Sequence, residues 1–322
     1  MPQETILETK VPPDKAGFTL LDFLTSRFRY HTRDEWESLI RKGKVRVNGQ
    51  KPSPLQILHK GNRVSHAVPR DEPEVNLTVE ILHRETSFLV VAKPAGLPCH
   101  ADGIFRAHTL LGVFRSMPDI PSRSLGLPHR LDRETSGLMV VSLLREAQKN
   151  LSRQFETGSV SKEYLAIVQG EPAWETIDEK DFIGPARGSS ISLRRTVVNP
   201  DTPGAQMAHT RFEVLKRLPG ACLIKCIPHS GRTHQIRVHL EHLGHPVVGD
   251  KLYGRSDDEY LSYVRHVKDH TSLDLTAAFG AKRQLLHASR LSFGHPETGA
   301  PLSFESPMPQ DMAESAGHPH IF

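Results

Sequence analysis

Two helical patterns of hydrophobic and polar residues stand near the start of the chain. Apolar side chains gather on one face of residues 20–28 and again over residues 32–40, which predicts two short amphipathic helices. Thr32 followed three residues later by Glu35 is the signature of a capping box at the start of the second helix. Gly43 is suited to end that helix, because glycine readily adopts the left-handed conformation found at helix C-termini.

Strand patterns follow the two helices. The alternation over residues 45–47 predicts a strand, the dipeptide Asn48-Gly49 predicts a tight hairpin turn, and residues 63–65 form another short strand pattern. Together these elements predict a small α+β domain over residues 1–68. A linker is expected at residues 69–76, where prolines and charged residues replace the periodic pattern.

The longer remainder, residues 77–322, mixes short strand patterns with helical ones, which predicts an α+β domain. Strands are expected over residues 79–82, 88–92, 138–144, 164–168, 212–215 and 222–227. Helices are expected over residues 145–155 and 236–243. Residues 172–203, rich in Gly, Pro and Ser, are interpreted as strands with exposed loops, and the charged segment 255–282 as a peripheral insertion around a helical stretch.

Composition excludes several classes of protein. The chain has 322 residues, of which 37% are hydrophobic, so it can bury a sizeable core as one large or two unequal domains. It has no apolar run long enough to span a membrane and no apolar segment of a secretory signal, so we expect no membrane partner and a cytoplasmic location. Three cysteines without C-x-x-C spacing fit a reducing compartment, and Cys222 and Cys226 are expected to pack in the core.

Charge is distributed unevenly along the chain. The net charge is only +4, but residues 18–66 hold ten basic residues against four acidic ones. A small basic domain attached to a nearly neutral body suggests an electrostatic anchor for a polyanion. The alternative is a generic α+β cap with a solvated basic face. The candidate anchor residues lie on the second helix and the turn after it: Arg33, Arg41, Lys42, Lys44 and Arg46.

Two segments about a hundred residues apart carry the densest chemistry. Residues 129–137 read His-Arg-Leu-Asp-Arg-Glu-Thr-Ser-Gly, so Asp132 stands between Arg130 and Arg133 on a loop that enters an apolar strand. Residues 229–239 read His-Ser-Gly-Arg-Thr-His-Gln-Ile-Arg-Val-His. Together they suggest a carboxylate held among cations in a site that handles a polyanion.

These two segments, in their order and spacing, resemble the RluA-type family of RNA pseudouridine synthases. Further resemblance lies in residues 93–97, 162–166, 244–254, 286–288 and 295–296, and it extends in all over residues 79–307. The small basic domain resembles the RNA-binding module named after ribosomal protein S4. The resemblance implies the pseudouridine synthase fold, in which a mixed, largely antiparallel sheet has a central cleft.

The resemblance also implies roles for three residues. Asp132 would be the catalytic carboxylate, acting near the ribose either as a nucleophile or as a base. Arg237 matches the arginine that pairs with this carboxylate and keeps it ionised. Tyr164 matches a tyrosine whose ring can stack on the target uracil and whose hydroxyl can take part in proton transfer at carbon 5. The structural alternatives are a loop carboxylate, a helix-surface salt bridge and a core tyrosine.

Five further residues of the same motifs are expected to contact the substrate RNA. They are His129, Arg130, Arg133, Lys162 and Arg232. The first three would flank a pocket for a uridine that has left its helix stack. By the same resemblance, the cations of the small basic domain would bind RNA.

No cofactor and no metal are expected. Isomerisation of uridine exchanges a carbon–nitrogen bond for a carbon–carbon bond without redox change, and the chain has neither a Walker loop nor a G-x-G-x-x-G motif. The histidines that cluster late in the chain are His234, His239, His242 and His245. No H-E-x-x-H motif is present among them, and their spacing drifts around a helix with no carboxylate in register.

Three classes of function are compatible with the sequence. An RNA pseudouridine synthase is favoured, and the alternatives are a non-catalytic RNA-binding or ribosome-assembly factor and a metal-dependent hydrolase. The joint presence of Asp132, Tyr164 and Arg237 argues against the non-catalytic alternative. We expect ribosomal RNA rather than transfer RNA as the substrate, and a monomeric enzyme.

Overall fold

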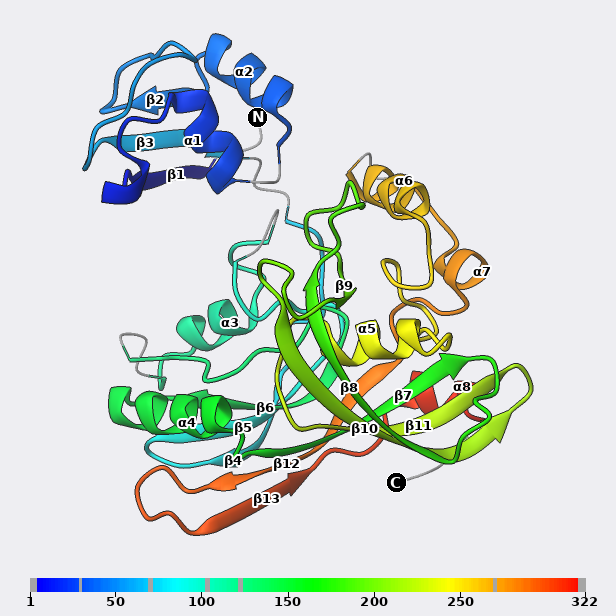
Figure 1. Cartoon of the computed structure of the whole chain (residues 1–322). Helices are drawn as coiled ribbons and strands as arrows, with labels where there is room; N and C mark the ends of the chain where they lie inside the picture. Colours follow the sequence, from blue (N-terminus) through cyan, green and yellow to red (C-terminus); the bar gives the residue numbers. More distant parts are fainter. Residues whose placement is uncertain are drawn as a thin grey trace. The chain divides into compact units, whose positions relative to one another are not determined.

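The computed structural model describes residues 5–28, 31–68, 72–101, 105–120, 124–268 and 271–317 (Figure 1). The chain divides into two compact units, residues 1–74 together with 100–109, and residues 75–99 together with 110–322. Each unit has a hydrophobic core of its own. Residues 69–71 of the expected linker lie outside the described part of the chain.

The small unit combines a three-stranded antiparallel sheet with two α-helices. Its elements are β1 (Thr5–Lys10), the short helix η1 (Pro13–Lys15), α1 (Leu20–Arg27), α2 (Arg33–Arg41), β2 (Val45–Val47) and β3 (Arg63–Val68). The strands lie in the order β1-β3-β2. Phe23, Trp36 and Ile40 are fully buried in one cluster, which joins the two helices to the sheet.

The local signals in this unit are confirmed. Glu35 N–H donates to the Thr32 hydroxyl at 3.3 Å, and Thr32 N–H donates to the Glu35 carboxylate at 2.7 Å, which completes the capping box of α2. Gly43 follows the helix with a φ of 72°. Asn48 and Gly49, with φ values of 51° and 80°, make the tight turn after β2. Strand β1 was not predicted.

The large unit is built on a ten-stranded sheet. Its strands are β4 (Glu80–Arg84), β5 (Phe88–Lys93), β6 (Ser136–Ser142), β7 (Ser161–Gln169), β8 (Thr176–Pro185), β9 (Arg195–Val198), β10 (Gln206–Leu218), β11 (Ala221–Pro228), β12 (Leu286–Gly294) and β13 (Pro301–Glu305). They lie in the order β4-β5-β6-β12-β7-β11-β10-β8-β9, and β13 pairs with β12. Strands β6 and β12 run parallel, and the other pairs of these strands are antiparallel. The expected mixed, largely antiparallel sheet is confirmed.

Helices lie over this sheet and beside it. They are α3 (Leu110–Ser116), α4 (Arg145–Thr157), α5 (Gln235–His242), α6 (Asp257–Lys268), α7 (Leu275–Phe279) and α8 (Gln310–Ser315). The predicted insertion at 255–282 contains α6 and α7, and its residues 269 and 270 lie outside the described part. Across the described residues, no helix has the length and apolar character that crossing a membrane requires.

Strands β5 and β6 are buried because helices cover both of their faces. Leu89 of β5 belongs to the same cluster as Phe114 of α3, whereas Val90 belongs to the same cluster as Leu151 of α4. Figure 1 shows α4 beside β5 and β6. A strand packed on both sides is a rigid support, so the loop that leads into β6 has a fixed end point.

Gly137 lets β6 lie against β12. Its φ is 110°, and a Cβ atom at this position would lie 2.2 Å from the carbonyl oxygen of Ala288. Any other residue would push the two strands apart. The glycine therefore places the loop before β6 next to β12 and β7.

Helix α5 packs against β8, β9, β10 and β11 (Figure 1). Ile236 and Leu240 form its apolar side and share a cluster with Cys222 and Cys226 of β11. Both cysteines are fully buried, so their predicted place in the core is confirmed. This packing fixes the start of α5, where Arg237 lies.

Candidate active site

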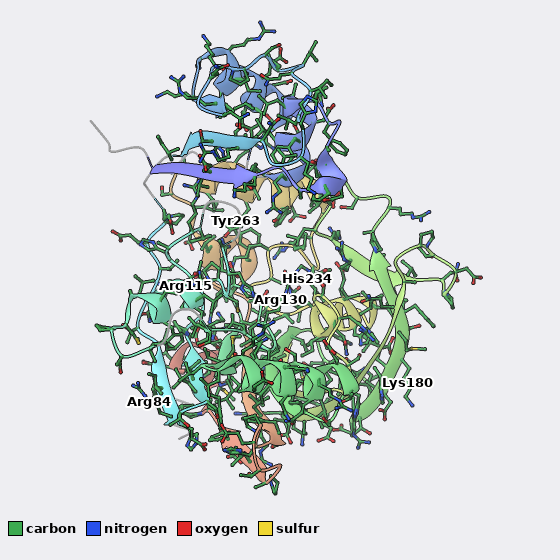
Figure 2. The ribbon with its side chains drawn as sticks, turned by 90° about the vertical axis from the view of Figure 1, so that its left-hand side faces the viewer. Arg84, Arg115, Arg130, Lys180, His234 and Tyr263 are labelled. Carbon is green, nitrogen blue, oxygen red and sulfur yellow. The ribbon has the colours of Figure 1, made fainter. Side chains whose placement is uncertain are left out.

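A cavity of about 450 Å³ lies in the large unit, where the loop before β6, the end of α4, β7 and the turn before α5 meet. Its lining includes His129, Arg130, Asp132, Phe155, Lys162, Tyr164, Arg232, His234 and Arg237. The fold thus brings together the two motif segments that are about a hundred residues apart in the sequence. Figure 2 labels one residue from each segment, Arg130 and His234, close to one another.

Buried Lys93, at the end of β5, holds the loop that carries Asp132. Its ammonium group donates to the carbonyl oxygens of Arg133 at 3.0 Å, Leu97 at 2.9 Å and Pro94 at 2.8 Å. Burial lowers the pKa of Lys93 to about 8, against the opposing influence of Cys99 and Asp132. The lysine therefore ties the loop to the end of β5 through the Arg133 carbonyl, and its other two bonds hold the turn that follows β5.

The following residues of the loop are held from the β12 side. The Glu134 carboxylate accepts from the Lys251 ammonium at 2.9 Å and from Gln284 N–H at 3.0 Å. The Gln284 side chain donates to the Thr135 hydroxyl at 2.6 Å. With anchors on both sides, the position of Asp132 is set by the sheet rather than by the loop itself.

Asp132 is directed by an arginine that bridges two carboxylates. Nη1 of Arg237 donates to Oδ2 of Asp132 at 2.7 Å. The other edge of the same guanidinium donates to both carboxylate oxygens of Asp250, at 2.6 and 2.9 Å. Asp250 is 1% exposed and also accepts from the backbone N–H groups of Leu252 and Tyr253. Arg237 is thereby fixed in one orientation.

The charge state of Asp132 follows from this arrangement. Burial alone would raise the pKa of Asp132, but the charges of His234 and Arg237 and the hydrogen bond from Arg237 lower it to about 2. His234 is itself neutral at pH 7, because burial and the nearby Arg237 lower its pKa to about 4. Arg237 is therefore the cation that keeps Asp132 ionised at neutral pH.

His234 occupies a strained position directly before α5. Its φ of 57° lies in the left-handed region, which a non-glycine residue adopts only when its surroundings enforce it. The Tyr253 hydroxyl accepts from Arg195 N–H at 3.2 Å, so its own proton can be donated to Nδ1 of His234, 2.9 Å away. That leaves the proton of the neutral ring on Nε2, which faces Asp132 at 3.8 Å.

Tyr164 extends from β7 into the same cavity. Its ring packs against two of the core clusters, which fixes the side chain between them. Burial, and then the negative charge of Asp132, raise the pKa of Tyr164 well above its usual value. The residue is therefore a neutral phenol at physiological pH, able to donate and to accept a hydrogen bond.

Cations line the cavity around the carboxylate. Lys162 donates to the carbonyl oxygen of Ser230 at 3.1 Å, and burial together with the charge of Arg232 lowers its pKa to about 8. Arg232 is exposed and donates to the Met207 carbonyl at 3.0 Å. Arg130 is exposed as well. The predicted substrate contacts Arg130, Lys162 and Arg232 thus all reach the cavity.

The two remaining predicted substrate contacts, His129 and Arg133, each interact with other groups of the protein. His129 accepts from Val140 N–H through Nε2 at 3.1 Å and stacks on Phe155 at 4.2 Å between ring centroids. Burial, and secondarily Lys162, lower its pKa to about 3, so the ring is neutral. Arg133 is absent from the cavity lining, and its guanidinium lies 3.3 Å from both the Glu134 carboxylate and the Tyr263 hydroxyl of α6.

The candidate anchor residues belong to the small unit. All five of them, Arg33, Arg41, Lys42, Lys44 and Arg46, are exposed. Two are engaged with acidic neighbours: Arg33 with Asp22 at 2.7 Å and Arg41 with Glu37 at 2.5 Å. Arg46 projects from the solvent-facing side of β2. The exposed cations therefore extend from the end of α2 across the turn to β2.

The four clustered histidines do not converge on one point. His234 contacts Tyr253, His239 lies 3.0 Å from the Thr210 hydroxyl, and His245 lies 3.0 Å from the Gln169 carbonyl. His242 is near Glu179 instead. The four side chains therefore contact different partners.

Several residues that shape the site were missed in the sequence. Asp250, Tyr253 and Lys93 lie within segments that resemble the family, but nothing in their spacing shows what they touch. The signal that could have found Asp250 is its place in Gly-Asp-Lys-Leu-Tyr-Gly, where a carboxylate can accept from the backbone two and three residues later.

Comparison with known proteins identifies the family. Residues 87–242 match the family model described as RNA pseudouridylate synthase. The chain is 31% identical over 315 residues to ribosomal large subunit pseudouridine synthase C of Escherichia coli (strain K12), covering 94% of this chain and 93% of that protein. The chain belongs to the RNA pseudouridylate synthase family. The resemblance predicted from the sequence is confirmed, and the chain is an RNA pseudouridine synthase.

Other family members agree with this assignment. Ribosomal large subunit pseudouridine synthase D of Neisseria meningitidis serogroup B is 34% identical over 310 residues, covering 94% of this chain and 79% of that protein. Among solved structures, human RNA pseudouridylate synthase domain containing 4 aligns with a TM-score of 0.57 and 26% identity, over 74% of this chain and 92% of that one. The pseudouridine synthase fold is therefore shown.

The region that matches the family model holds the centre of the cavity. Asp132, Tyr164 and Arg237 all fall within residues 87–242, whereas Asp250 and Tyr253 lie beyond it. The small unit also lies outside that region, although the alignments with the bacterial synthases extend over 94% of the chain.

Proposed function

We propose that this enzyme isomerises a uridine of large-subunit ribosomal RNA to pseudouridine, with Asp132 as its catalytic carboxylate. The observation that carries the proposal is the state of Asp132, a carboxylate kept ionised and directed by Arg237 inside a cavity lined with cations. Cations around the cavity favour a polyanionic substrate, and the carboxylate supplies the reactive group.

The reaction needs no group beyond those of the chain. The bond from C1′ of the ribose to N1 of uracil breaks, the base turns, and a bond from C1′ to C5 forms. The hydrogen on C5 leaves as a proton and N1 takes up a proton, so atoms and charge balance. Asp132 can serve this sequence in two ways, by attack on C1′ or by removal of the proton on C2′. Arg237 directs the carboxylate for either route.

Tyr164 would position the base and move a proton. Its ring, which lines the cavity, offers a surface on which uracil can stack, and its hydroxyl is a neutral group. Because its pKa is raised, the phenol can take the proton from C5 only while it passes its own proton on. We therefore assign Tyr164 a proton-transfer role in which a second group accepts the phenol proton while Tyr164 takes the proton from C5.

Binding would involve both units of the chain. Lys162, Arg130 and Arg232 would contact phosphates beside the flipped uridine, and His129 would keep the cavity wall in place. The small unit, proposed as an S4-like RNA-binding domain over residues 1–68, would add the exposed cations of α2 and β2. Salt-sensitive contacts of this kind raise affinity without selecting a base.

The names of the relatives support the choice of RNA. Both the Escherichia coli and the Neisseria meningitidis proteins are named as ribosomal large subunit pseudouridine synthases. Large-subunit ribosomal RNA is accordingly the proposed substrate, in preference to transfer RNA. A ribosomal substrate also fits the cytoplasmic location expected from the sequence.

Tritium release tests the proposed substrate. Purified enzyme is incubated, without added metal, with unmodified large-subunit ribosomal RNA or transfer RNA that carries tritium at carbon 5 of uridine. The reaction expels that hydrogen, so release from the ribosomal RNA alone is the expected result. Release from transfer RNA with none from ribosomal RNA would overturn the substrate assignment, and no release from either would overturn the catalytic function.

A further inference from the structure

A second cluster of chemically reactive side chains lies on the other side of α5 from the cavity residue Arg237. Glu179 and Asp181 alternate on β8, so their side chains share one face of the strand. His242 approaches them from the last turn of α5, with its Nε2 3.9 Å from Oε1 of Glu179. One ligand atom from each of the three residues lies within 4.8 Å of the others.

The two carboxylates are placed unfavourably for an unliganded protein. Glu179 is only 9% exposed, and its carboxyl group is within hydrogen-bond reach of that of Asp181. Two acidic groups in contact need a shared proton or a bound cation between them. No arginine or lysine pairs with either carboxylate in the part of the chain that the structure describes.

His239 supplies a second, independent observation. It lies one turn before His242 on the same helix and is fully buried. Its Nδ1 is 3.0 Å from the Thr210 hydroxyl, while its Nε2 is buried without a hydrogen-bond partner among the described residues. Thr210 is the register partner of Glu179 on the neighbouring strand, and Asp181 is the first of the surrounding charges that act on His239. A buried imidazole with one unsatisfied nitrogen thus lies within the electrostatic influence of Asp181, outside the group of three ligand residues.

We propose that Glu179, Asp181 and His242 form a binding site for a divalent transition metal, Zn²⁺ in the first instance, with water as the fourth ligand. One imidazole and two carboxylates suit zinc, which takes nitrogen and oxygen ligands and keeps water in its fourth position where the protein supplies three. His242 has a side chain 51% exposed, which leaves an entry path from solvent. The histidine spacing alone did not predict this site, because β8 rather than α5 supplies the carboxylates.

The site would be structural and separate from the uridine chemistry. Its ligands come from β8 and from the end of α5, so a bound ion would join the helix to the sheet. A second group on the molecule, Asp178 with His209 and His229, also has metal-ligand atoms within 4.8 Å. In that group the Asp178 carboxylate and the His209 ring already pair with each other at 2.7 Å, so a substitution of His209 serves as the control for the proposed site.

Metal content tests the proposal without relying on activity. Tag-free, full-length protein is stripped with a chelator, exposed to Zn²⁺, passed over a desalting column and measured by atomic emission. We expect one zinc per chain in the wild type, and at least tenfold weaker binding in Asp181→Asn and in His242→Ala. His209→Ala, the matched control, should keep the zinc, and zinc should raise the melting temperature of the wild type but not of His242→Ala.

Three results would each overturn the assignment. The first is a wild type that retains no zinc, which requires no variant to interpret. The second is equal retention by the wild type, Asp181→Asn and His242→Ala. The third is loss of zinc in His209→Ala with retention in His242→Ala, which would move the site to the other face of β8. Circular dichroism on each variant confirms that it is folded.

Discussion

Arg237 is the side chain on which the geometry of the cavity depends most. Its guanidinium reaches two carboxylates at once, Asp132 on one edge and buried Asp250 on the other. A lysine keeps the charge but has a single ammonium group, which cannot hold both carboxylates in the same orientation. The direction of Asp132, and not only its ionisation, is therefore set by an arginine.

Replacing Arg237 by lysine should separate positioning from charge. We expect kcat to fall by about 10²-fold, the loss typical of a small misplacement of a reacting group, with RNA affinity changed less than about threefold. Single-turnover tritium release and filter binding measure the two quantities. Arg217→Lys, at an exposed arginine paired with Glu175, is the control and should leave both unchanged. An Arg237→Lys enzyme with the wild-type rate would argue against the positioning role.

Lys162 should make RNA binding sensitive to alkaline pH. Its pKa is lowered to about 8, chiefly by burial, so in the free protein it loses its charge as the pH rises from 7 to 9. A phosphate would bind the charged form, so affinity should fall by up to about tenfold per pH unit above 8. Binding titrations at several pH values should show this fall in the wild type and a flatter profile in Lys162→Met. Lys180→Met, at an exposed lysine of β8, should keep the wild-type profile.

At the scale of elements, the close approach of β6 to β12 determines where the loop that carries Asp132 lies. This approach depends on Gly137, whose missing side chain leaves room for the Ala288 carbonyl. Lys93 lies at the end of β5, and Gln284 lies just before β12. They hold the loop from the two strands that flank β6 in the sheet. The loop is thus an extension of the sheet.

Gly137→Ala should destabilise the large unit. The positive φ and the 2.2 Å approach to Ala288 together predict a loss of about 3 kcal/mol in the free energy of unfolding. Urea denaturation measures the loss. Gly188→Ala is the matched control, because Gly188 has no atom within 4 Å of an added Cβ and no positive φ. Equal stability of the two variants would contradict the account of the β6–β12 pairing.

The sequence predicted those elements whose pattern is local. The capping box at Thr32, the turn at Asn48 and the apolar strand β6 follow from neighbouring residues alone. Strand β12 was not predicted, although it lies near the middle of the sheet. Its His287 is a polar interruption of the strand pattern, and it is tolerated in the core because Ser136 and the Ser306 carbonyl bond to both ring nitrogens. Such partners are visible only after folding.

The site shows the same difference between features that the sequence predicts and features that only the folded chain shows. The resemblance of the motifs to the family was enough to select Asp132, Tyr164 and Arg237, and the structure places all three around one cavity. It was not enough to find Asp250 or Lys93, because they act on other protein groups and touch them only in the folded chain. Motifs that resemble the family therefore nominate the reacting groups, and the fold reveals what orients them.

At the scale of the whole molecule, the basic small unit and the nearly neutral large unit have different proposed tasks. The cavity residues act on one nucleotide, whereas exposed Lys42, Lys44 and Arg46 offer charge to the RNA backbone. Binding of this second kind releases counterions and so depends on salt. Affinity and turnover should therefore respond to different substitutions.

Removing Lys42, Lys44 and Arg46 together, each replaced by alanine, should weaken binding and lower its salt dependence. The slope of log affinity against log salt should fall by about 0.7–0.9 for each phosphate that the variant no longer neutralises, while turnover at saturating RNA stays near the wild-type value. The matched control removes three exposed cations of the large unit, Arg84, Arg217 and Arg290. An unchanged salt slope in the first variant would contradict the anchor role.

Asp132→Asn, assayed for tritium release beside the wild type, tests the central claim most directly. Asparagine keeps the size of the side chain but supplies neither a nucleophile nor a base, so release should fall by about 10⁴-fold or more while RNA affinity stays within about threefold. Asp201→Asn, at an exposed aspartate, should behave as the wild type. Release by Asp132→Asn at a rate close to that of the wild type would contradict the account.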